Sequence, residues 1–287
     1  MPSRRFAYVD DGVPEIGTRF LQESCQQRNC EFVSFHPAKF DFSTTDQLEP
    51  GDLLYRPAIS LAAQRVEQML FAPGVATFYA DENGPFFGYT NSSLLFQRNG
   101  LAVPRTIFCH TSDRKVLDHY ATRLGGFPLV FKITGFSTGI GVGRLDSPAS
   151  LYSFADLALA IGRYPLLMSY VPEAVHWRMV VVGERVVASY RNVINENDFR
   201  TSASREGADY DAVPSPSLER LALNATQALR LEFTGVDVLE HSSGRGYLLE
   251  ANFPCYYAQA QDVAGVDISG AMLDHLIAKA ERLTQQR

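Results

Sequence analysis

The sequence predicts an α/β domain at the N-terminus, followed by a longer α+β region. Strands and helices alternate in the first part of the chain, a stretch rich in turn formers follows, and strand–turn–strand hairpins occur in the second half. Alternating strands and helices are typical of an open, mostly parallel sheet, whereas a hairpin joins antiparallel strands. The two halves of the chain are therefore expected to differ in sheet type.

The N-terminal part contains alternating strand and helix patterns. The predicted strands are RFAYVDD, CEFVSFH, DLLYRPA and GVATFYA, and the predicted helices are PEIGTRFLQESCQQRN and 61–70. The stretch ADENGPFFGYTNSS follows the fourth strand and is rich in turn formers. It predicts a domain boundary near Glu82.

The second part mixes helices with hairpins. Helices are expected at 92–99, 113–124, 149–161 and 268–283, and strands at LAVPRTIFC, FPLVFKI and PLLMSYV. WRMVVVGERVVASYRNVI is expected to be a hairpin that turns at Gly183 and Glu184. SPSLERLALNATQALRL has the apolar spacing of a helix, with Ser215 as its N-cap and Pro216 as its first residue.

Composition excludes several classes of protein. Hydrophobic residues make up 46% and charged residues 20%, which is typical of a soluble globular protein. The net charge of −6 argues against a nucleic-acid partner, and no run approaches the ~18 apolar residues of a membrane span. The start of the chain has no apolar signal-peptide core, and the four cysteines lack metal-ligand spacing, so reduced thiols in a cytoplasmic protein are expected.

Two facing acids form the first candidate site. FTGVDVLE and GYLLEANF flank HSSGRG, and a hairpin centred between Ser243 and Gly244 places Asp237 opposite Glu250. Like charges at facing positions repel, and Asn252 shares the face of Glu250 because side chains alternate along a strand. Three oxygen ligands favour Mg²⁺, with Mn²⁺ as the alternative, and such ions complete their shell with substrate phosphates. The competing interpretation is a solvated face of an exposed hairpin.

A strand lysine and a glycine-rich loop form the second candidate site. Lys132 lies on the strand FPLVFKI, and TGFSTGIGVG follows this strand. Such loops turn backbone N–H groups toward phosphate oxygens. The spacing fits neither a Walker A motif, nor a protein-kinase glycine loop, nor a Rossmann fingerprint. The alternative is a flexible hairpin tip beside a lysine that extends its ammonium into water.

The two sites together resemble the ATP-grasp ligases. A strand lysine with a flexible loop precedes, by about a hundred residues, an Asp and a Glu-x-Asn on adjacent strands. The resemblance is to the branch that adds glutamate to a ribosomal protein and to related lysine-biosynthesis and peptide-modifying ligases. It runs from about Asp52 to Lys279. The matching segments are SYVPEAVHWRMVVVGERVVASYRNVINENDFRTSASREGA, FTGVDVLE, YLLEANFP and AGVDISGAML.

The resemblance implies a fold and a set of site residues. A pre-ATP-grasp α/β domain would occupy 1–88, a central lid subdomain 89–168 and a C-terminal subdomain 169–287, the last two with antiparallel sheets and helices. Implied nucleotide-binding residues are Lys132 at the α- and β-phosphates, the lid residues Thr134, Gly135, Ser137, Thr138, Gly139 and Gly141, and the adenine-contacting backbone of Ser169, Tyr170 and Val171. The implied catalytic residues are Arg178 and Arg200, and the implied ligands of one or two Mg²⁺ ions are Asp237, Glu250 and Asn252.

The implied activity is ATP-dependent ligation of a carboxylate to an amine through an acyl phosphate, with release of ADP. The substrates would be an amino acid, a peptide or a small amine, and the family is often homo-oligomeric. Two alternatives remain open: an ATP-grasp kinase that phosphorylates a small molecule, and a nucleotide-binding scaffold that has lost catalysis.

Several segments depart from the family pattern. The lysine of an "RDK"-like element is missing from GYTNSS, HWR replaces the usual Asp-x-Arg spacing, SASREGA replaces LHRGG and leaves Arg205 one register away, and NFPCYY replaces NxSPG. The last changes lie where acceptors bind and favour a different substrate. The missing lysine favours the scaffold alternative.

Other residues have two interpretations each. His176 is either a general base or a loop histidine bonded to backbone, and Cys255 is either a nucleophile or a buried packing residue. Tyr256 and Tyr257 line an acceptor pocket or belong to the core. Arg56 binds a substrate carboxylate or forms a structural ion pair.

Overall fold

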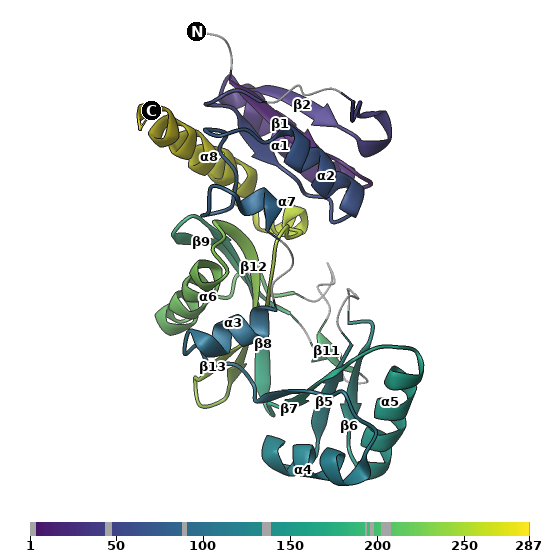
Figure 1. Ribbon diagram of the computed structural model, residues 1–287. Coiled ribbons are helices and arrows are strands. Elements are labelled where there is room, and N and C mark those ends of the chain that lie inside the picture. The colour runs from purple at the N-terminus through teal and green to yellow at the C-terminus, as the bar shows by residue number, and fades with distance from the viewer. Residues whose placement is uncertain are drawn as a thin grey trace.

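The structure is a computed structural model that describes residues 4–43, 48–87, 91–133, 139–192, 194–195, 198–201 and 208–286. It places three sheet-containing units along one axis, with the sheet of the C-terminal segment between the other two (Figure 1). The N-terminal sheet is parallel and the two larger sheets are antiparallel, as the sequence predicts.

The N-terminal unit is a small parallel sheet of order β2-β1-β3. Its elements are β1 (Arg5–Val9), α1 (Glu15–Gln27), β2 (Glu31–Phe35), the 3₁₀ turn η1 (Pro37–Lys39), β3 (Leu53–Tyr55) and α2 (Leu61–Leu70). Helix α2 has the predicted bounds, and its N-cap Ser60 accepts a hydrogen bond from the Ala63 N–H.

The predicted fourth strand, GVATFYA, is wrong. Ala76 makes one parallel bridge to Leu53, and the chain then leaves the sheet. The backbone groups of the following residues are used elsewhere: the Ala80 N–H donates to the Arg230 carbonyl, and the Phe78 carbonyl accepts from the Glu232 N–H. This segment therefore has the residue pattern of a strand, but its backbone connects the N-terminal unit to the C-terminal unit.

The central unit is an antiparallel sheet of order β4-β7-β5-β6, covered by two helices. Its elements are β4 (Thr106–Phe108), α4 (Arg114–Leu124), β5 (Leu129–Lys132), β6 (Val142–Leu145), α5 (Pro148–Ala160) and β7 (Leu166–Ser169). Helix α4 begins after Asp113, whose carboxylate accepts hydrogen bonds from two backbone N–H groups, and ends at Gly125, which has φ of 101°. Strand β6 begins at Val142, so it includes the last two residues of the predicted glycine-rich loop and continues beyond it.

The C-terminal unit is built on a four-stranded sheet of order β13-β12-β8-β9. Its elements are α3 (Ser92–Arg98), β8 (Ala174–Val182), β9 (Arg185–Asn192), β10 (Ile194–Asn195), β11 (Asp198–Thr201), α6 (Pro216–Ala228), β12 (Phe233–His241), β13 (Gly246–Asn252), α7 (Ala258–Ala264) and α8 (Ile268–Gln285). The turn η2 (Gly84–Phe86) precedes them, and the β8–β9 hairpin turns at Gly183 and Glu184 as predicted. Ser215 is the N-cap of α6, but its hydroxyl bonds to Ser217 and caps no N–H among the described residues.

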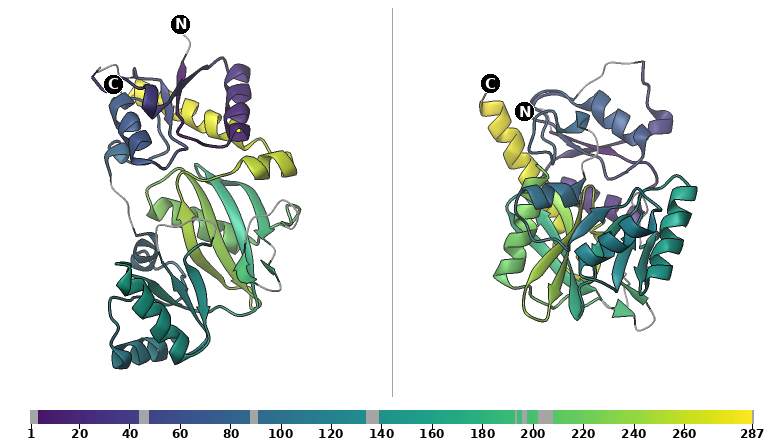
Figure 2. Two further views of the ribbon diagram at one scale, coloured as in Figure 1. Left: turned by 90° about the vertical axis from the view of Figure 1, so that its right-hand side faces the viewer. Right: turned by 60° about the horizontal axis from the view of Figure 1, so that its bottom comes forward.

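The two faces of this sheet have different partners. On one face, Trp177, Met179 and Val236 pack with α6 and with Phe96 of α3. On the other face, Val180, Val182 and Phe233 join a core that includes β1, β3, α1 and α8. Helix α8 returns from the C-terminal sheet to the N-terminal unit (Figure 2). The proposed boundaries at 88 and 168 stay predictions.

The four cysteines are free and buried. Within the described part of the chain, no helix combines the length and apolar composition that a membrane crossing needs.

A partly buried polar cluster links the N-terminal and C-terminal units. The Lys279 ammonium donates to the Thr77 and Tyr79 carbonyls at 3.0 and 2.6 Å, and lies 2.7 Å from the Glu232 carboxylate. His275 lies 3.0 Å from the same carboxylate oxygen. Burial opposes the charge of Glu232, but His275 and Lys279 outweigh it and lower the pKa of this carboxyl.

We expect Lys279→Met to lower the free energy of unfolding by about 1–3 kcal/mol, because it removes a charged hydrogen-bond donor from a partly buried carboxylate and two carbonyls. Lys115→Met, on the exposed side of α4, should change it by less than about 0.5 kcal/mol. Urea denaturation measures both. The pKa of Glu232 is lower in the folded protein than in the unfolded chain. The stability that this carboxylate contributes is therefore complete above the unfolded-state pKa, and it is lost as the pH falls through the folded-state pKa. The difference in the free energy of unfolding between wild type and Lys279→Met should therefore become smaller as the pH falls below 4.5. Equal stability of the two lysine variants at pH 7 would contradict the cluster's role.

Candidate active site

The candidate residues occupy one face of the C-terminal sheet. Glu250, Asp237, Arg178 and Tyr190 are paired in a row across β13, β12, β8 and β9. Because strand side chains alternate with period two, their neighbours at a spacing of two residues share this face. Those neighbours include Asn252, Gly235, His176 and Asn192. The same face is apolar where the N-terminal unit covers it, so its polar part lies beyond that cover.

The predicted register of the acidic hairpin is confirmed. Asp237 pairs with Glu250, and Gly235 pairs with Asn252. Nearer the turn, however, Val238 pairs with Leu248, so β13 contains one extra residue, Leu249, at a bulge. The turn is therefore centred one half-residue away from the predicted position, and the bulge restores the predicted pairing at the acids.

Asp237 is buried and is neutralised by a buried arginine. Arg178 Nη1 donates to Asp237 Oδ2 at 2.6 Å, and the side chains are 13% and 10% exposed. Burial would raise the pKa of Asp237, but the Arg178 guanidinium, with His176, outweighs it and holds this pKa below its ordinary value. The sequence predicted Asp237 as a metal ligand and Arg178 as a phosphate-binding residue, but it did not predict the ion pair between them.

Gly235 makes room for this pair. A Cβ atom at Gly235 would lie 2.4–2.7 Å from three atoms of the Arg178 guanidinium, which is closer than van der Waals contact. Gly235 precedes Asp237 by two residues and so lies on the same face of β12. The glycine in FTGVD is the sequence signal for a large side chain that crosses the strand from its neighbour.

His176 is a strand residue, so its predicted place in a loop is wrong. Its Nε2 lies 3.2 Å from Asp237 Oδ1, and its Nδ1 lies 3.2 Å from the Asn192 amide nitrogen. Two side chains, those of Asp237 and Asn192, are therefore partners of His176. Asn192 and Tyr190 were missed by the sequence analysis, although their spacing of two on a strand beside His176 and Arg178 was the available signal.

Lys132 joins the two antiparallel sheets. It ends β5 of the central sheet, and its ammonium contacts the Glu250 carboxylate of β13. Asn252 Nδ2 lies 3.0 Å from Glu250 Oε1 and 3.5 Å from Asp237 Oδ2. The strand lysine and the Glu-x-Asn element, 118 residues apart, therefore meet at one place.

Only the end of the glycine-rich loop belongs to the described residues. Thr134, Gly135, Ser137 and Thr138 lie outside them. Gly139 and Gly141 have φ of 77° and 78°, a conformation that glycine adopts without strain.

Arg200 lies beside the end of this loop. Its Nη1 donates to the Gly139 carbonyl at 3.2 Å, and its Nη2 lies 2.6 Å from Asp198. Hydrogen bonds from Arg200 hold the pKa of Asp198 at about 2. The structure thus brings the second predicted catalytic arginine to the loop.

Ser169, Tyr170 and Val171 form the connection between the two antiparallel sheets. Ser169 ends β7, and its N–H donates to the Arg105 carbonyl at 2.9 Å. Arg144 of β6 lies over the Tyr170 ring, 5.0 Å from its centre. The segment therefore lies at the junction where an adenine-binding hinge is predicted, although the Ser169 N–H is already used.

The donor set fits a hard divalent cation. Two carboxylates converge with the Asn252 amide, whose nitrogen faces both acids in this structure. Inversion of this amide would add its oxygen as a third ligand, and carboxylate and amide oxygens are the ligand types of Mg²⁺. Among the described residues, no three His, Cys, Asp or Glu side chains gather around one point, so a metal needs Asn252 or substrate oxygens as further ligands. Arg178 Nε is buried and has no hydrogen-bond partner in the described part of the chain, which suits an additional acceptor such as a phosphoryl oxygen.

The structure favours the structural interpretation for several other residues. Arg56 is buried and lies 2.7 Å from Glu67, so it forms an internal ion pair. Burial raises the pKa of the Cys255 thiol to about 12, which keeps it protonated at neutral pH. The Tyr257 hydroxyl bonds Ser269 in the core at 2.9 Å, whereas Tyr256 is half exposed.

Comparison with known proteins agrees with this arrangement. Among solved structures, the ATP-grasp ligase PsnB with its minimal precursor superposes with a TM-score of 0.70 at 18% identity, covering 96% of this chain and 99% of PsnB. D-alanine–D-alanine ligase of Bacillus anthracis with ATP gives a TM-score of 0.65 at 14% identity, covering 100% of this chain and 99% of that enzyme. These similarities show the ATP-grasp fold.

Sequence comparison identifies the family. The RimK-like ATP-grasp domain matches residues 89–276, and the chain belongs to this family. The ribosomal protein bS6–L-glutamate ligase of Escherichia coli O139:H28 is 30% identical over 184 residues, 63% of this chain and 60% of the relative. The probable alpha-L-glutamate ligase 2 of Pseudoalteromonas atlantica is 27% identical over 192 residues, 66% of this chain and 63% of the relative. The matched segment thus spans about three fifths of these relatives.

We expect Gly235→Ala to lower the free energy of unfolding by about 1–3 kcal/mol, because the new methyl group displaces the Arg178 guanidinium. In an Arg178→Met background, Gly235→Ala should lower the free energy of unfolding by much less, because the flexible methionine side chain can bend away from the new methyl group. Gly143→Ala is the control, because a Cβ atom there would lie 3.7 Å from its nearest neighbour, a ring carbon of Phe154, which is an ordinary van der Waals contact. A double-mutant cycle by urea denaturation measures the coupling, and equal costs in both backgrounds would contradict the packing argument.

Proposed function

We propose that this chain is an ATP- and Mg²⁺-dependent, ADP-forming ligase that joins a carboxylate to the amine of an amino acid, a peptide or a small molecule. The observation that carries the proposal is the convergence of Lys132 from the central sheet with Glu250, Asp237, Asn252 and Arg178 from the C-terminal sheet. The relatives give further support: the E. coli relative is a glutamate ligase, and PsnB was solved with a precursor, Mg and ADP.

Each residue has a proposed task at this junction. Lys132 releases Glu250 and binds the α- and β-phosphates of ATP. Glu250, Asp237 and Asn252 would hold one or two Mg²⁺ ions, which neutralise charge on the phosphates when bound. Arg178 stays on Asp237 and offers its free Nε to the transferred phosphoryl group. The backbone of 169–171 contacts adenine, and the loop that ends at Gly141 closes over the γ-phosphate with Arg200 beside it.

The proposed chemistry has two steps. A substrate carboxylate oxygen attacks the γ-phosphorus of ATP, and the bond between this phosphorus and the bridging oxygen of the β-phosphate breaks. ADP departs, and the substrate is now an acyl phosphate. The amine then attacks the acyl carbon, phosphate departs, and the amine loses a proton to give the amide. The chain contributes by positioning the reactants and by supplying cations where negative charge develops. Closure of the loop excludes water, which would otherwise hydrolyse the acyl phosphate.

The main test is ADP and phosphate release with Mg·ATP over a panel of amino acids and short peptides. Wild type should release both with one carboxylate–amine pair and yield a product with the mass of the amide. Glu250→Gln should lower the rate at least about 100-fold, because the charge that holds the cation is lost. Glu184→Gln, in the exposed turn between β8 and β9, is the matched control and should be unchanged.

The outcomes separate the rival functions. A stable phosphorylated product without free phosphate would identify a kinase. Mg²⁺-dependent ATP binding without turnover on any substrate would favour the scaffold, to which the lysine missing from GYTNSS points. Failure to bind Mg·ATP, measured by calorimetry on the wild type, would contradict the nucleotide site itself.

Lys132→Met should weaken ATP binding by about 10- to 100-fold, because a hydrogen bond to a charged group contributes roughly 1.5–3 kcal/mol. Calorimetry with a non-hydrolysable ATP analogue and Mg²⁺ measures this. Lys115→Met, which changes the net charge equally, should bind as wild type does. An unchanged affinity in Lys132→Met would mean that Lys132 serves only to join the sheets.

A further inference from the structure

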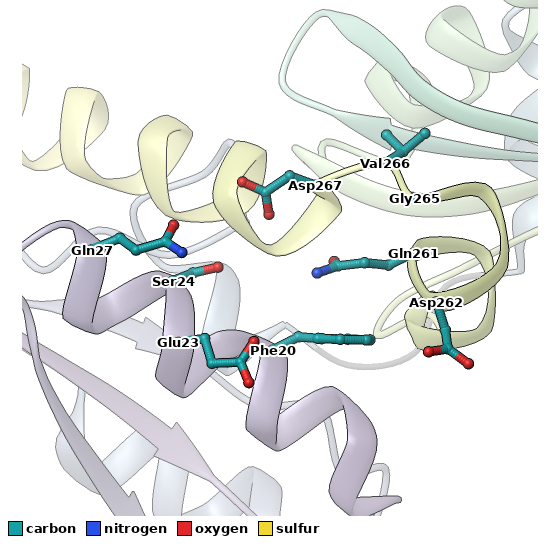
Figure 3. Close-up of a pocket in the computed structure, with 9 residues that line it drawn as sticks. All are labelled: Phe20, Glu23, Ser24, Gln27, Gln261, Asp262, Gly265, Val266 and Asp267. Carbon is teal, nitrogen blue, oxygen red and sulfur yellow. The ribbon is translucent and has the colours of Figure 1, made fainter.

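A polar pocket that is separate from the candidate active site lies between α1 and the segment from α7 to the start of α8. Its volume is about 430 Å³, within the range of small-ligand sites. Phe20, Glu23 and Ser24 line it from α1, and Gln261 and Asp267 line it from the other side (Figure 3). None of its lining residues belongs to the candidate active site.

The lining of this pocket carries only negative charge. Glu23, Asp262 and Asp267 contribute carboxylates, and no lining residue is Lys, Arg or His. Two arginines approach from outside the lining. Arg19 lies 3.9 Å from Glu23, and Arg28 lies 3.8 Å from Asp267 while binding Asp274 more closely, at 2.6 Å. The lining of the pocket therefore favours cations, and the arginines beside Glu23 and Asp267 lie 3.9 and 3.8 Å from these two carboxylates.

The hydroxyl of a buried serine points into the same space. Ser24 is 3% exposed, and its hydroxyl bonds no described residue. In Figure 3 its oxygen points toward the pocket and the Gln261 amide. The residue as a whole is buried, but its oxygen is open to the pocket, so it is available to accept a hydrogen bond from a group that enters there.

The amide of Gln261 is held in one orientation. Its Oε1 accepts hydrogen bonds from the Ser269 N–H at 2.8 Å and the Ser269 hydroxyl at 3.0 Å. Its amide nitrogen is thereby left for the pocket, and Figure 3 shows that nitrogen directed toward Ser24. A fixed N–H donor beside carboxylates matches a ligand that carries a carbonyl as well as a cation.

We propose that this pocket binds the ammonium or guanidinium group of a lysine or arginine side chain in a peptide. Glu23, Asp267 and Ser24 accept hydrogen bonds from the cation, and Gln261 donates one to a peptide carbonyl. Phe20 supplies an apolar wall for the methylene groups of the side chain. Arg19 already lies over this ring, 5.5 Å from its centre, which shows that the wall accommodates a long cationic side chain.

The pocket is connected to the candidate active site through the chain itself. The short segment 253–257 joins Asn252 of β13 to α7, which contributes Gln261. A basic peptide in the pocket would thus contact the same continuous segment that ends in the proposed metal ligands. Binding in the pocket requires neither ATP nor catalysis, so it is testable even if the proposed ligase function is wrong.

The test is a calorimetric titration of the full chain, without nucleotide, with three probes. They are capped Gly-Lys-Gly, capped Gly-norleucine-Gly, and putrescine. We expect the lysine peptide to bind at least about tenfold more tightly than its norleucine counterpart, because only the former carries a charge-assisted donor. Putrescine binding equal to or tighter than that of the lysine peptide would assign the site to free amines.

Three variants locate the binding. Glu23→Gln should weaken the lysine peptide about tenfold, and Arg19→Gln should strengthen it because it removes a competing cation. Glu23 and Arg19 are largely exposed, so both variants should fold. Glu184→Gln is the control for the loss of one negative charge. Equal affinity for the lysine and norleucine peptides, no binding of any probe, or an equal effect of Glu23→Gln and Glu184→Gln would overturn the proposal.

Discussion

The buried pair of Asp237 and Arg178 is the constraint on which the rest of the site depends. An isolated buried carboxylate is costly, and here a guanidinium on the neighbouring strand supplies the opposite charge. The pair requires that β12 and β8 lie in a fixed register and that Gly235 has no side chain. A shift by one residue would move every polar side chain to the face that packs against α6.

The same sheet face serves two purposes because its composition changes along the strands. Val180, Val182 and Phe233 are covered by the N-terminal unit and α8, whereas Arg178 and Asp237 lie at the junction with the central unit. The connection 169–171 and the contact between Lys132 and Glu250 join that central unit to the sheet. Packing of the N-terminal unit therefore positions the sheet, and the polar half of its face remains available for chemistry.

The sequence predicted local features well and side-chain pairing across strands poorly. Alternation and turn residues were enough to predict α2, the β8–β9 hairpin and the facing of Asp237 and Glu250. They were not enough for residues 78–80, because the backbone partners of Phe78 and Ala80 lie 150 or more positions later in the chain. Nor did they show that His176 borders Asp237, because β8 and β12 are neighbours only through the order of the sheet.

The two ion pairs of the site differ in the way that nucleotide binding would require. Arg178 and Asp237 are both about nine-tenths buried, so separating them leaves a charge without solvent or partner. Lys132 and Glu250 are 28% and 37% exposed, and a pair with access to water contributes little net stability. Lys132 can therefore exchange Glu250 for a phosphate at low cost, which frees Glu250 for a cation at the same moment. Asp237 and Glu250 each have a cationic partner within the protein, so this face of the sheet needs no ligand in order to fold. Lys132 can leave Glu250, so the same face can still bind a nucleotide and a cation.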